Sequence, residues 1–367
     1  MEAVTIRLEN ISKTFIHKVK GEVTAVNHVN LQVRPGELLT LLGPSGCGKT
    51  TTLRMIAGFE HPEVGRIYLN EEDVTELMAN RRNMGFVFQN YALFPHLSVF
   101  ENVAYGLKVQ ELPQEKIAPA VAEVLRLVGL EGYEHQFPNQ LSGGEQQRVA
   151  LARAIVIKPR VLLFDEPLSN LDAKLRIHTR SEIRRLQKAL HITAVYVTHD
   201  QEEAMAISDR IVVMNAGKIM QIGTAEDLYF YPDSDFVAKF IGKINTIPAE
   251  IEAVTDGVVT LKVFRHTYRI ENSPVTVSPG QKLDVFVRPE LVELDENAEN
   301  GHFTGIVQER TFLGEKVDYV MDIDGCQISA TSYDPFQHAT FSLHQKLGIR
   351  LNENSIKILR HEEHQAL

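Results

Sequence analysis

A short apolar segment followed by a glycine-rich loop restricts the fold of this 367-residue chain more than any other feature. The segment ELLTLLG (37–43) has the composition of a buried strand, and the loop GPSGCGKT (43–50) runs into a helical pattern from about Lys49. Two glycines separated by four residues and followed by Lys and Thr allow successive N–H groups to point into one concavity, which suits phosphate oxygens. The loop therefore predicts a nucleotide phosphate site at the end of a buried strand.

Further apolar runs indicate the kind of sheet to which this strand belongs. Short apolar runs alternate with helical patterns, which is typical of a largely parallel sheet covered by helices. We predict further strands at 83–89, 160–166, 193–199 and 210–223. Between Asn90 and Lys158 the apolar spacing becomes helical, as at Val121, Val124 and Val128, and indicates a helical insertion.

The character of the chain changes near residue 243. Residues 244–360 contain short alternating stretches such as KLDVFVR, broken by Gly, Pro and Asn, and predict an all-β region. QKLDVFVRPELVEL (281–294) resembles QKLGIRLNENSIKIL (345–359), which indicates either an internal repeat or a chance similarity. We therefore expect an α/β phosphate-loop nucleotide-binding domain over 1–242, with its helical subdomain at about 90–158, and a small all-β domain of the OB-like barrel type over 243–367.

Charge and cysteine content exclude several classes of protein. The formal net charge is −10, of which −7 falls on residues 243–367, so neither part has the basic balance of a dedicated nucleic-acid binder. Cys47 and Cys326 form no metal-binding pattern. The start of the chain lacks the pattern of a signal peptide, and no apolar run approaches the ~20 residues of a membrane helix. Any role at a membrane must then depend on partner chains.

Polar residues at strand ends suggest the chemistry. Lys49 offers a positive charge to the β- and γ-phosphates of a nucleotide, and the Thr50 hydroxyl suits Mg²⁺. VLLFDE (161–166) ends in two carboxylates, of which Asp165 can hold the Mg²⁺ shell and Glu166 can polarise a water toward the γ-phosphate. His199 and Gln89 also follow predicted strands, and the carboxyl ends of parallel strands are where ligands collect. We expect His199 at the γ-phosphate and Gln89 near Mg²⁺ and the attacking water.

Three segments allow two interpretations each. Asp172 is either a polar contact of the site or a helix cap. The stretch after Gln89, which contains Phe94 and Leu97, is either a contact surface or part of the core. The last seven residues, HEEHQAL, are expected to form a frayed tail and not a metal site.

LSGGE (141–145) begins another helix. Ser142 and Glu145 have the spacing of a capping box, but glycine costs about 1 kcal/mol inside a helix, so Gly143 and Gly144 argue against a purely stabilising role. Glycines here allow an anion to approach the exposed N–H groups at the positive helix end. The segment therefore predicts a second phosphate site.

Together these motifs resemble the ATP-binding cassette ATPases of membrane transporters, over nearly the whole chain. LSGGE looks like the signature sequence of that family. The resemblance implies that two copies pair head to tail, so that ATP on the phosphate loop of one copy is covered by the signature of the other. The residues implied to hold ATP are Phe15, Gly43, Pro44, Ser45, Gly46, Cys47, Gly48, Lys49, Thr50, Thr51, Ser142, Gly143, Gly144 and Asp172.

The resemblance also implies individual roles. Glu166 would be the catalytic base, Asp165 a water-mediated Mg²⁺ ligand and His199 the switch histidine. Gln89 would couple the site to a permease, and Asp172 would communicate across the dimer. The resemblance further implies that Lys49 is one of the catalytic residues and that Thr50, Gln89 and Asp165 are metal-binding residues. Phe15 stands where the family often has Tyr beneath the adenine and keeps the stacking face, although the basic stretch IHKVKGEV follows it.

The C-terminal β domain with FVRPE (286–290) resembles that of importer ATPases of the maltose, sulfate, polyamine and ferric-iron type. This implies two transmembrane permease subunits, an external solute-binding protein and a peripheral position at the cytoplasmic face of the inner membrane. Ferric iron is the first expectation for the solute, followed by polyamine, and then by sulfate, phosphonate or sugar. An exporter ATPase and a non-transport cassette ATPase acting on nucleic acid or the ribosome are the alternatives.

Overall fold

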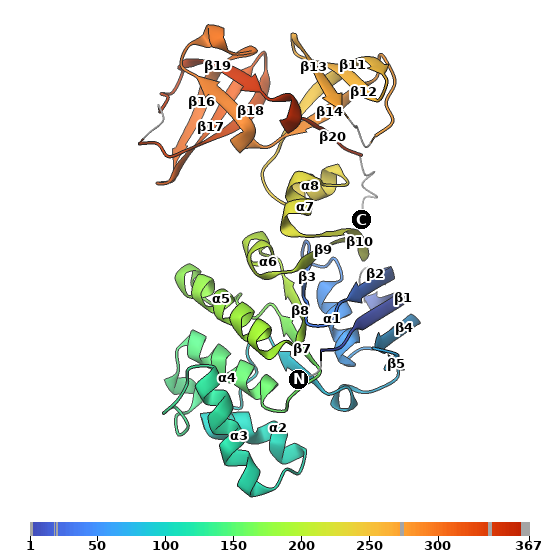
Figure 1. Cartoon of the computed structure of the whole chain (residues 1–367), viewed down its shortest axis with the longest axis vertical. Helices are drawn as coiled ribbons and strands as arrows, with labels where there is room; N and C mark the ends of the chain where they lie inside the picture. Colours follow the sequence, from blue (N-terminus) through green and yellow to red (C-terminus); the bar gives the residue numbers. More distant parts are fainter. Residues whose placement is uncertain (1–2, 18, 20, 272–274, 337–339, 361–367) are drawn as a thin grey trace. The chain divides into compact units, whose positions relative to one another are not determined.

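The chain consists of two compact units, residues 1–228 and 229–367 (Figure 1). The structure is a computed structural model that describes residues 3–17, 19, 21–271, 275–336 and 340–360. The segment HEEHQAL therefore lies outside the described residues.

A six-stranded sheet forms the centre of the first unit, in the order β10-β9-β3-β8-β7-β6. Its strands are parallel except β10, which runs antiparallel to β9. Each predicted strand is present, and the predicted segment 210–223 is a hairpin of two strands. The bounds are β3 (Leu38–Leu42), β6 (Met84–Val87), β7 (Val161–Asp165), β8 (Thr193–Thr198), β9 (Arg210–Asn215) and β10 (Lys218–Gly223).

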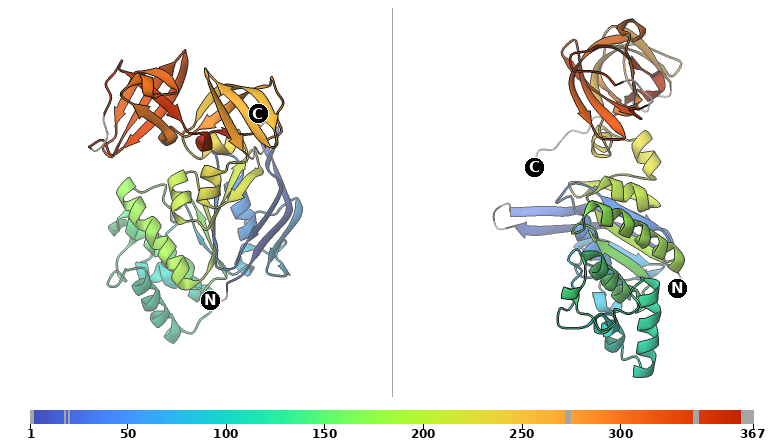
Figure 2. Two further views of the ribbon diagram at one scale, coloured as in Figure 1. Left: turned by 45° about the horizontal axis from the view of Figure 1, so that its top comes forward. Right: turned by 90° about the vertical axis from the view of Figure 1, so that its left-hand side faces the viewer.

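A second, antiparallel sheet of the order β2-β1-β4-β5 was not expected from the sequence. It buries one face against the central sheet, where Ile6 and Leu8 share a core with Leu39 and Leu41. Figure 2 shows β1 and β2 side by side along one flank of the unit. The four strands are β1 (Ile6–His17), β2 (Gly21–Val33), β4 (Val64–Leu69) and β5 (Glu72–Asp73).

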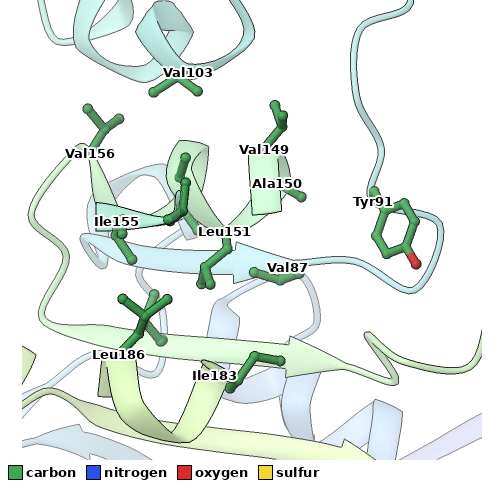
Figure 3. Packing of buried hydrophobic residues seen from close by; sticks show 14 of the residues in the cluster. Val87, Tyr91, Val103, Val149, Ala150, Leu151, Ile155, Val156, Ile183 and Leu186 are labelled. Carbon is green, nitrogen blue, oxygen red and sulfur yellow. The ribbon is translucent and has the colours of Figure 1, made fainter. Parts of the chain in front are cut away.

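Helices account for most of the remaining first unit. Apolar side chains of α4 and α5 pack on one face of the central sheet, with Val87 and Leu151 among those drawn in Figure 3, and this cluster extends to α2 and α3. The helices of this unit are α1 (Lys49–Ala57), α2 (Val99–Val109), α3 (Gln114–Leu127), α4 (Gly143–Ile155), α5 (Ala173–Leu190) and α6 (Gln201–Ile207), with short 3₁₀ turns at η1 (Ala79–Arg81) and η2 (Pro138–Gln140). Helix α7 (Ala225–Phe230) begins in the first unit and ends in the second.

A buried arginine links the end of α1 to the segment that follows β5. Arg82 is 1% exposed, and its guanidinium donates hydrogen bonds to the carbonyls of Met55, Ile56, Thr75 and Leu77. Two of these acceptors are among the last carbonyls of α1, which have no partner within the helix. Burial lowers the pKa of Arg82 to about 10, so the side chain remains a cation at neutral pH.

Replacing Arg82 with Met should therefore destabilise the first unit by about 3 kcal/mol or more, because four carbonyls each lose a hydrogen bond from the buried guanidinium. Denaturant unfolding of the full chain, followed through the transition of the first unit, measures this loss. Exposed Arg81→Met is the matched control and should change stability by less than ~0.5 kcal/mol. Equal stability of the two variants would contradict the prediction.

The second unit confirms the expected all-β fold and contains two five-stranded sheets. One has the order β13-β12-β11-β14-β20 and the other β15-β19-β16-β17-β18. The strands of the first sheet are β11 (Asn245–Thr255), β12 (Val258–Val263), β13 (His266–Glu271), β14 (Lys282–Val287) and β20 (Lys357–Ile358). Those of the second sheet are β15 (Val292–Asp295), β16 (Phe303–Phe312), β17 (Lys316–Ile323), β18 (Cys326–Tyr333) and β19 (Lys346–Leu351).

The internal similarity corresponds to a structural repeat. Each of the two similar segments forms a strand, a 3₁₀ turn and a short strand, with the turns at η3 (Pro289–Leu291) and η5 (Glu353–Ser355). The short strand of each segment pairs with the long strand of the other, β15 with β19 and β20 with β14. The two sheets thus exchange their fifth strands, and their inner faces share one core.

Residues 229–243 belong with the β-rich unit. This segment contains α8 (Asp235–Phe240), and the buried Arg288 donates hydrogen bonds to the carbonyls of Tyr229, Ala238 and Lys243. These bonds attach the segment to the turn after β14. A further short turn, η4 (Ala298–Asn300), precedes β16.

Candidate active site

The glycine-rich loop curls around the ammonium group of Lys49. Gly46 and Gly48 have φ values of 81° and 106°, a region open mainly to glycine, and a Cβ on Gly48 would overlap the carbonyl of Ala25. Lys49 is 5% exposed, and its Nζ donates to the carbonyls of Gly43 at 2.7 Å and Pro44 at 2.9 Å. Since α1 begins at Lys49, the free N–H groups of a helix N-terminus face the same loop.

The other loop residues differ in exposure. Ser45 is exposed, whereas Pro44 and Thr51 are half-buried. Cys47 is buried, and burial raises the pKa of its thiol above the ordinary value even though Lys49 lies beside it. Cys47 therefore serves as a small packing residue beneath the loop, since a thiol held protonated is a poor nucleophile.

Thr50 and Asp165 lie together at the end of the central strands. The Thr50 hydroxyl donates to Asp165 Oδ1 at 3.1 Å, although the two residues are far apart in sequence. Burial raises the pKa of the Asp165 carboxyl, while the bond from Thr50 and the positive charge of Arg54 oppose that rise. A hydroxyl and a carboxylate oxygen are the hard donors that Mg²⁺ prefers.

Glu166 and His199 form the second close pair. Glu166 Oε2 lies 3.1 Å from His199 Nδ1, and the imidazole is the more exposed of the two side chains. The pair meets because β7 and β8 are parallel neighbours, with Asp165 opposite Val197. Glu166 has φ +46°, and its N–H donates to the Val197 carbonyl at 3.1 Å. A non-glycine residue in this region is strained, as is common at functional sites.

Gln89 lies two residues beyond β6, on the far side of β7 from β8. Its side chain is exposed, and its carbonyl accepts a hydrogen bond from Asn170 Nδ2 at 2.9 Å. Phe94 and Leu97 in the following stretch are half-buried, and the Phe94 ring contacts that of the exposed Tyr105. The stretch therefore packs partly on the core and leaves the aromatic side chain of Tyr105 exposed, and its role as a contact surface stays a prediction.

Phe15 lies near the phosphate loop on β1. It pairs with Val23, two residues along β2 from Ala25, whose carbonyl contacts Gly48. The Phe15 ring is 38% exposed and the Lys13 ammonium lies 5.3 Å from its centre. An exposed aromatic face at this position is available for stacking.

The signature segment forms the expected capping box. Ser142 Oγ accepts from the N–H of Glu145, and Glu145 Oε2 accepts from the N–H of Ser142 at 2.7 Å. The structure adds a packing role for the glycines that the sequence did not reveal. A Cβ on Gly143 or Gly144 would come within 3.1 Å of a leucine side chain, that of Leu171 or Leu175 respectively.

Asp172 is the N-cap of α5, where its Oδ1 accepts from the N–H of Leu175 at 2.9 Å. The capping interpretation therefore holds, and the residue is also exposed. Two further side chains that the sequence analysis did not identify, Asn170 and Arg153, bind the backbone that follows β6. No sequence pattern marked either residue, because their partners are main-chain carbonyls.

Among the described residues, no group of three or more His, Cys, Asp and Glu side chains is arranged to hold a metal ion. A Mg²⁺ ion is commonly held by one or two protein oxygens together with substrate phosphates, so the Thr50–Asp165 pair still fits it. No helix in the described part of the chain is long and apolar enough to cross a membrane.

Two segments of the chain match the models of known protein families. Residues 26–169 match the family model described as ABC transporter, and residues 285–357 match the TOBE domain. The Fe(3+) ions import ATP-binding protein FbpC of Brucella abortus (strain 2308) is 44% identical over 355 residues, which cover 97% of this chain and 98% of that protein.

Proteins named for another solute are similar to the same degree. The spermidine/putrescine import ATP-binding protein PotA of Acidothermus cellulolyticus is 49% identical over 87% of this chain and 84% of its own length. The PotA protein of Haemophilus ducreyi is 44% identical over 98% of this chain and 97% of its own length.

Among solved structures, the first unit resembles a dimeric cassette. The ATP-binding cassette MJ0796, described as dimeric in a post-hydrolysis state bound to ADP and Pi, has 33% sequence identity and a TM-score of 0.54. The match covers 60% of this chain and 98% of that structure.

Proposed function

The chain belongs to the ABC transporter family, as an ATP-hydrolysing subunit of an importer, and from that premise we propose that it drives the uptake of ferric iron. The support for ferric iron is the 44% identity to an iron-import ATP-binding protein over 97% of the chain. Import of a polyamine is the second candidate, because the spermidine/putrescine relatives match nearly as well. In the proposed importer the solute is bound by partner proteins, so transport by the assembled importer distinguishes the two candidates.

One observation supports hydrolysis: the glycine-rich loop with Lys49, the Asp165 carboxylate and the Glu166–His199 pair lie together in the structure. Lys49 and the N–H groups at the start of α1 bind the phosphates of ATP, and Phe15 stacks on the adenine. Glu166 accepts a proton from the water that attacks the γ-phosphate. His199 holds the Glu166 carboxylate in position and donates a hydrogen bond toward the γ-phosphate edge.

Mg²⁺ is the metal cofactor that these residues fit. Thr50 and Asp165 would hold it, Asp165 through water, and Gln89 would lie near it when the loop after β6 approaches the site. When bound with ATP, Mg²⁺ neutralises charge that develops on the β- and γ-phosphate oxygens.

A second copy of the chain completes the site. Ser142, Gly143 and Gly144 of one copy cover the γ-phosphate bound by the other, and Asp172 contacts the partner copy. The support is the N-terminus of α4, where Ser142 is exposed, and the similarity of the first unit to a dimeric cassette. ATP thereby holds the two copies together, and hydrolysis lets them separate.

Two transmembrane permease subunits and an external solute-binding protein are the remaining partners. The exposed aromatic stretch after Gln89 is the surface that passes the closure of the dimer to the permease. The chain then lies at the cytoplasmic face of the inner membrane as a peripheral subunit.

Uptake by the reconstituted importer tests the solute. We expect vesicles with this chain, its two permease chains and the solute-binding protein of the same importer to accumulate ferric iron in an ATP-dependent manner, and not spermidine or putrescine. Vesicles with Glu166→Gln in place of the native chain are the control for uptake without turnover. ATP-dependent accumulation of a polyamine alone would overturn the iron proposal and establish the second candidate.

A further inference from the structure

The segment after β6, residues 89–94, has a strained backbone. Tyr91 and Ala92 are consecutive residues with φ values of 59° and 48°, and neither is glycine. This left-handed region is disfavoured for residues that carry a Cβ, and it persists only where the surroundings hold it. We call residues 89–94 the Gln89 loop.

Arg153 of α4 supplies the contact that holds this conformation. Its Nη2 donates to the carbonyl of Tyr91 and its Nη1 to the carbonyl of Ala92, both at 2.7 Å. The guanidinium also lies 5.6 Å from the centre of the Phe94 ring. A planar guanidinium can bind two adjacent carbonyls at once, whereas a lysine ammonium has no such fork.

Other groups fix the ends of the Gln89 loop. The buried Asn102 accepts from the N–H of Phe94 at 2.9 Å and donates to its carbonyl at 3.1 Å. The buried ring of Tyr91, beyond the end of the strand that carries Val87 in Figure 3, anchors the middle of the loop. Asn170, from the connection between β7 and α5, binds the Gln89 carbonyl at 2.9 Å. The carbonyls of the two strained residues, Tyr91 and Ala92, thus accept their side-chain hydrogen bonds from Arg153 of α4.

The same helix has Ser142 at its other end. Ser142 caps α4 and Arg153 lies in its last turn, so one helix connects the two over about 16 Å. A displacement of the Ser142 end relative to β6 must therefore either carry the Tyr91 and Ala92 carbonyls with it or break the bonds to Arg153.

We propose that Arg153 is a positioning residue that makes the Gln89 loop follow α4 when Ser142 engages the ATP of a partner copy. This inference rests on the proposed ATP-bound dimer. Without Arg153 the Tyr91–Ala92 backbone relaxes out of the left-handed region, and the loop no longer responds to closure of the dimer.

Hydrogen exchange of the full-length chain tests the inference. The amides of Tyr91 and Ala92 donate to the carbonyls of Phe88 and Asn90, so their protection reports the strained conformation. In a Glu166→Gln background, we expect ATP to change exchange in the Gln89 loop. With Arg153→Gln added, exchange should be at least tenfold faster and should not respond to ATP, while ATP binding and ATP-driven dimer formation persist.

Two further variants separate positioning from general loss of structure. Arg153→Lys keeps the charge and should fail to restore the ATP response, because it lacks the fork. Arg148→Gln removes a cation from the same helix, one that faces Glu182 and not the Gln89 loop, and should leave the response intact. An ATP response that survives in Arg153→Gln, or is lost equally in Arg148→Gln, would overturn the inference. If the Glu166→Gln parent formed no dimer with ATP, the proposed function would fail and this inference with it.

Discussion

Replacing Glu166 with Gln is expected to lower steady-state ATP hydrolysis at least ~100-fold while ATP binding is retained. Gln has the same shape and can still hydrogen-bond His199, which lies 3.1 Å from the native carboxylate. It cannot accept the proton of the attacking water, so the reaction loses its base. Phosphate release at saturating ATP measures the loss, and size-exclusion chromatography with light scattering should detect a dimer that retains ATP.

The matched control is Glu202→Gln, which neutralises an exposed carboxylate on the nearby helix α6. Its turnover should stay within about twofold of the native protein, because exposed substitutions away from a site have small effects. Unimpaired hydrolysis in Glu166→Gln would show that another group accepts the proton. Loss of ATP binding would show instead that the substitution damaged the phosphate loop.

Replacing Ser142 with Arg should prevent ATP from joining two copies of the chain. The change places a long cation at the positive end of α4, next to glycines that already lie close to leucine side chains. The ATP-driven association should weaken at least ~100-fold, since a bulky side chain would stand where the γ-phosphate must approach. Nucleotide binding to the chain's own phosphate loop should remain within about threefold, as measured with a fluorescent ATP analogue.

A mixing experiment tests whether the two halves of the site come from different copies. Lys49→Ala removes the phosphate-binding ammonium but keeps Ser142, whereas Ser142→Arg keeps Lys49. Each variant alone should hydrolyse little ATP. An equal mixture should recover up to about a quarter of native activity, because half of the pairs contain one intact composite site out of two. If the mixture stays as inactive as the separate variants while mixed dimers form, the site does not combine residues from two copies.

Much of the fold followed directly from local sequence patterns. The apolar runs at 37–43, 83–89, 160–166 and 193–199 are the central strands β3, β6, β7 and β8, and the helical pattern from Lys49 is α1. These predictions succeeded because buried parallel strands have continuous apolar runs and the glycine-rich loop marks where a strand turns into a helix. The similarity between 281–294 and 345–359 also proved to be structural.

Features that depend on partners distant in sequence were missed. The sheet of β1, β2, β4 and β5 escaped notice because irregularities in pairing, such as the one between Leu8 and Ile11, interrupt the alternation along its strands. The exchange of β15 and β20 between the two C-terminal sheets depends on which strands pair with each other. The alternation of apolar and polar residues along a strand does not specify its partner strand.

The sequence by itself determined the chemistry, because a phosphate loop, two strand-end carboxylates and a glycine-rich helix start can be identified from residue types at fixed spacing. Only the tertiary structure decided which of these groups meet. The order of the parallel strands brings Thr50 to Asp165 and Glu166 to His199. The packing of α4 against β6 brings Arg153 to the carbonyls of Tyr91 and Ala92, the two residues with strained backbone. The physical reason is that a hydrogen bond to a main-chain carbonyl requires a position and not a particular partner residue, so it leaves no pattern in the sequence.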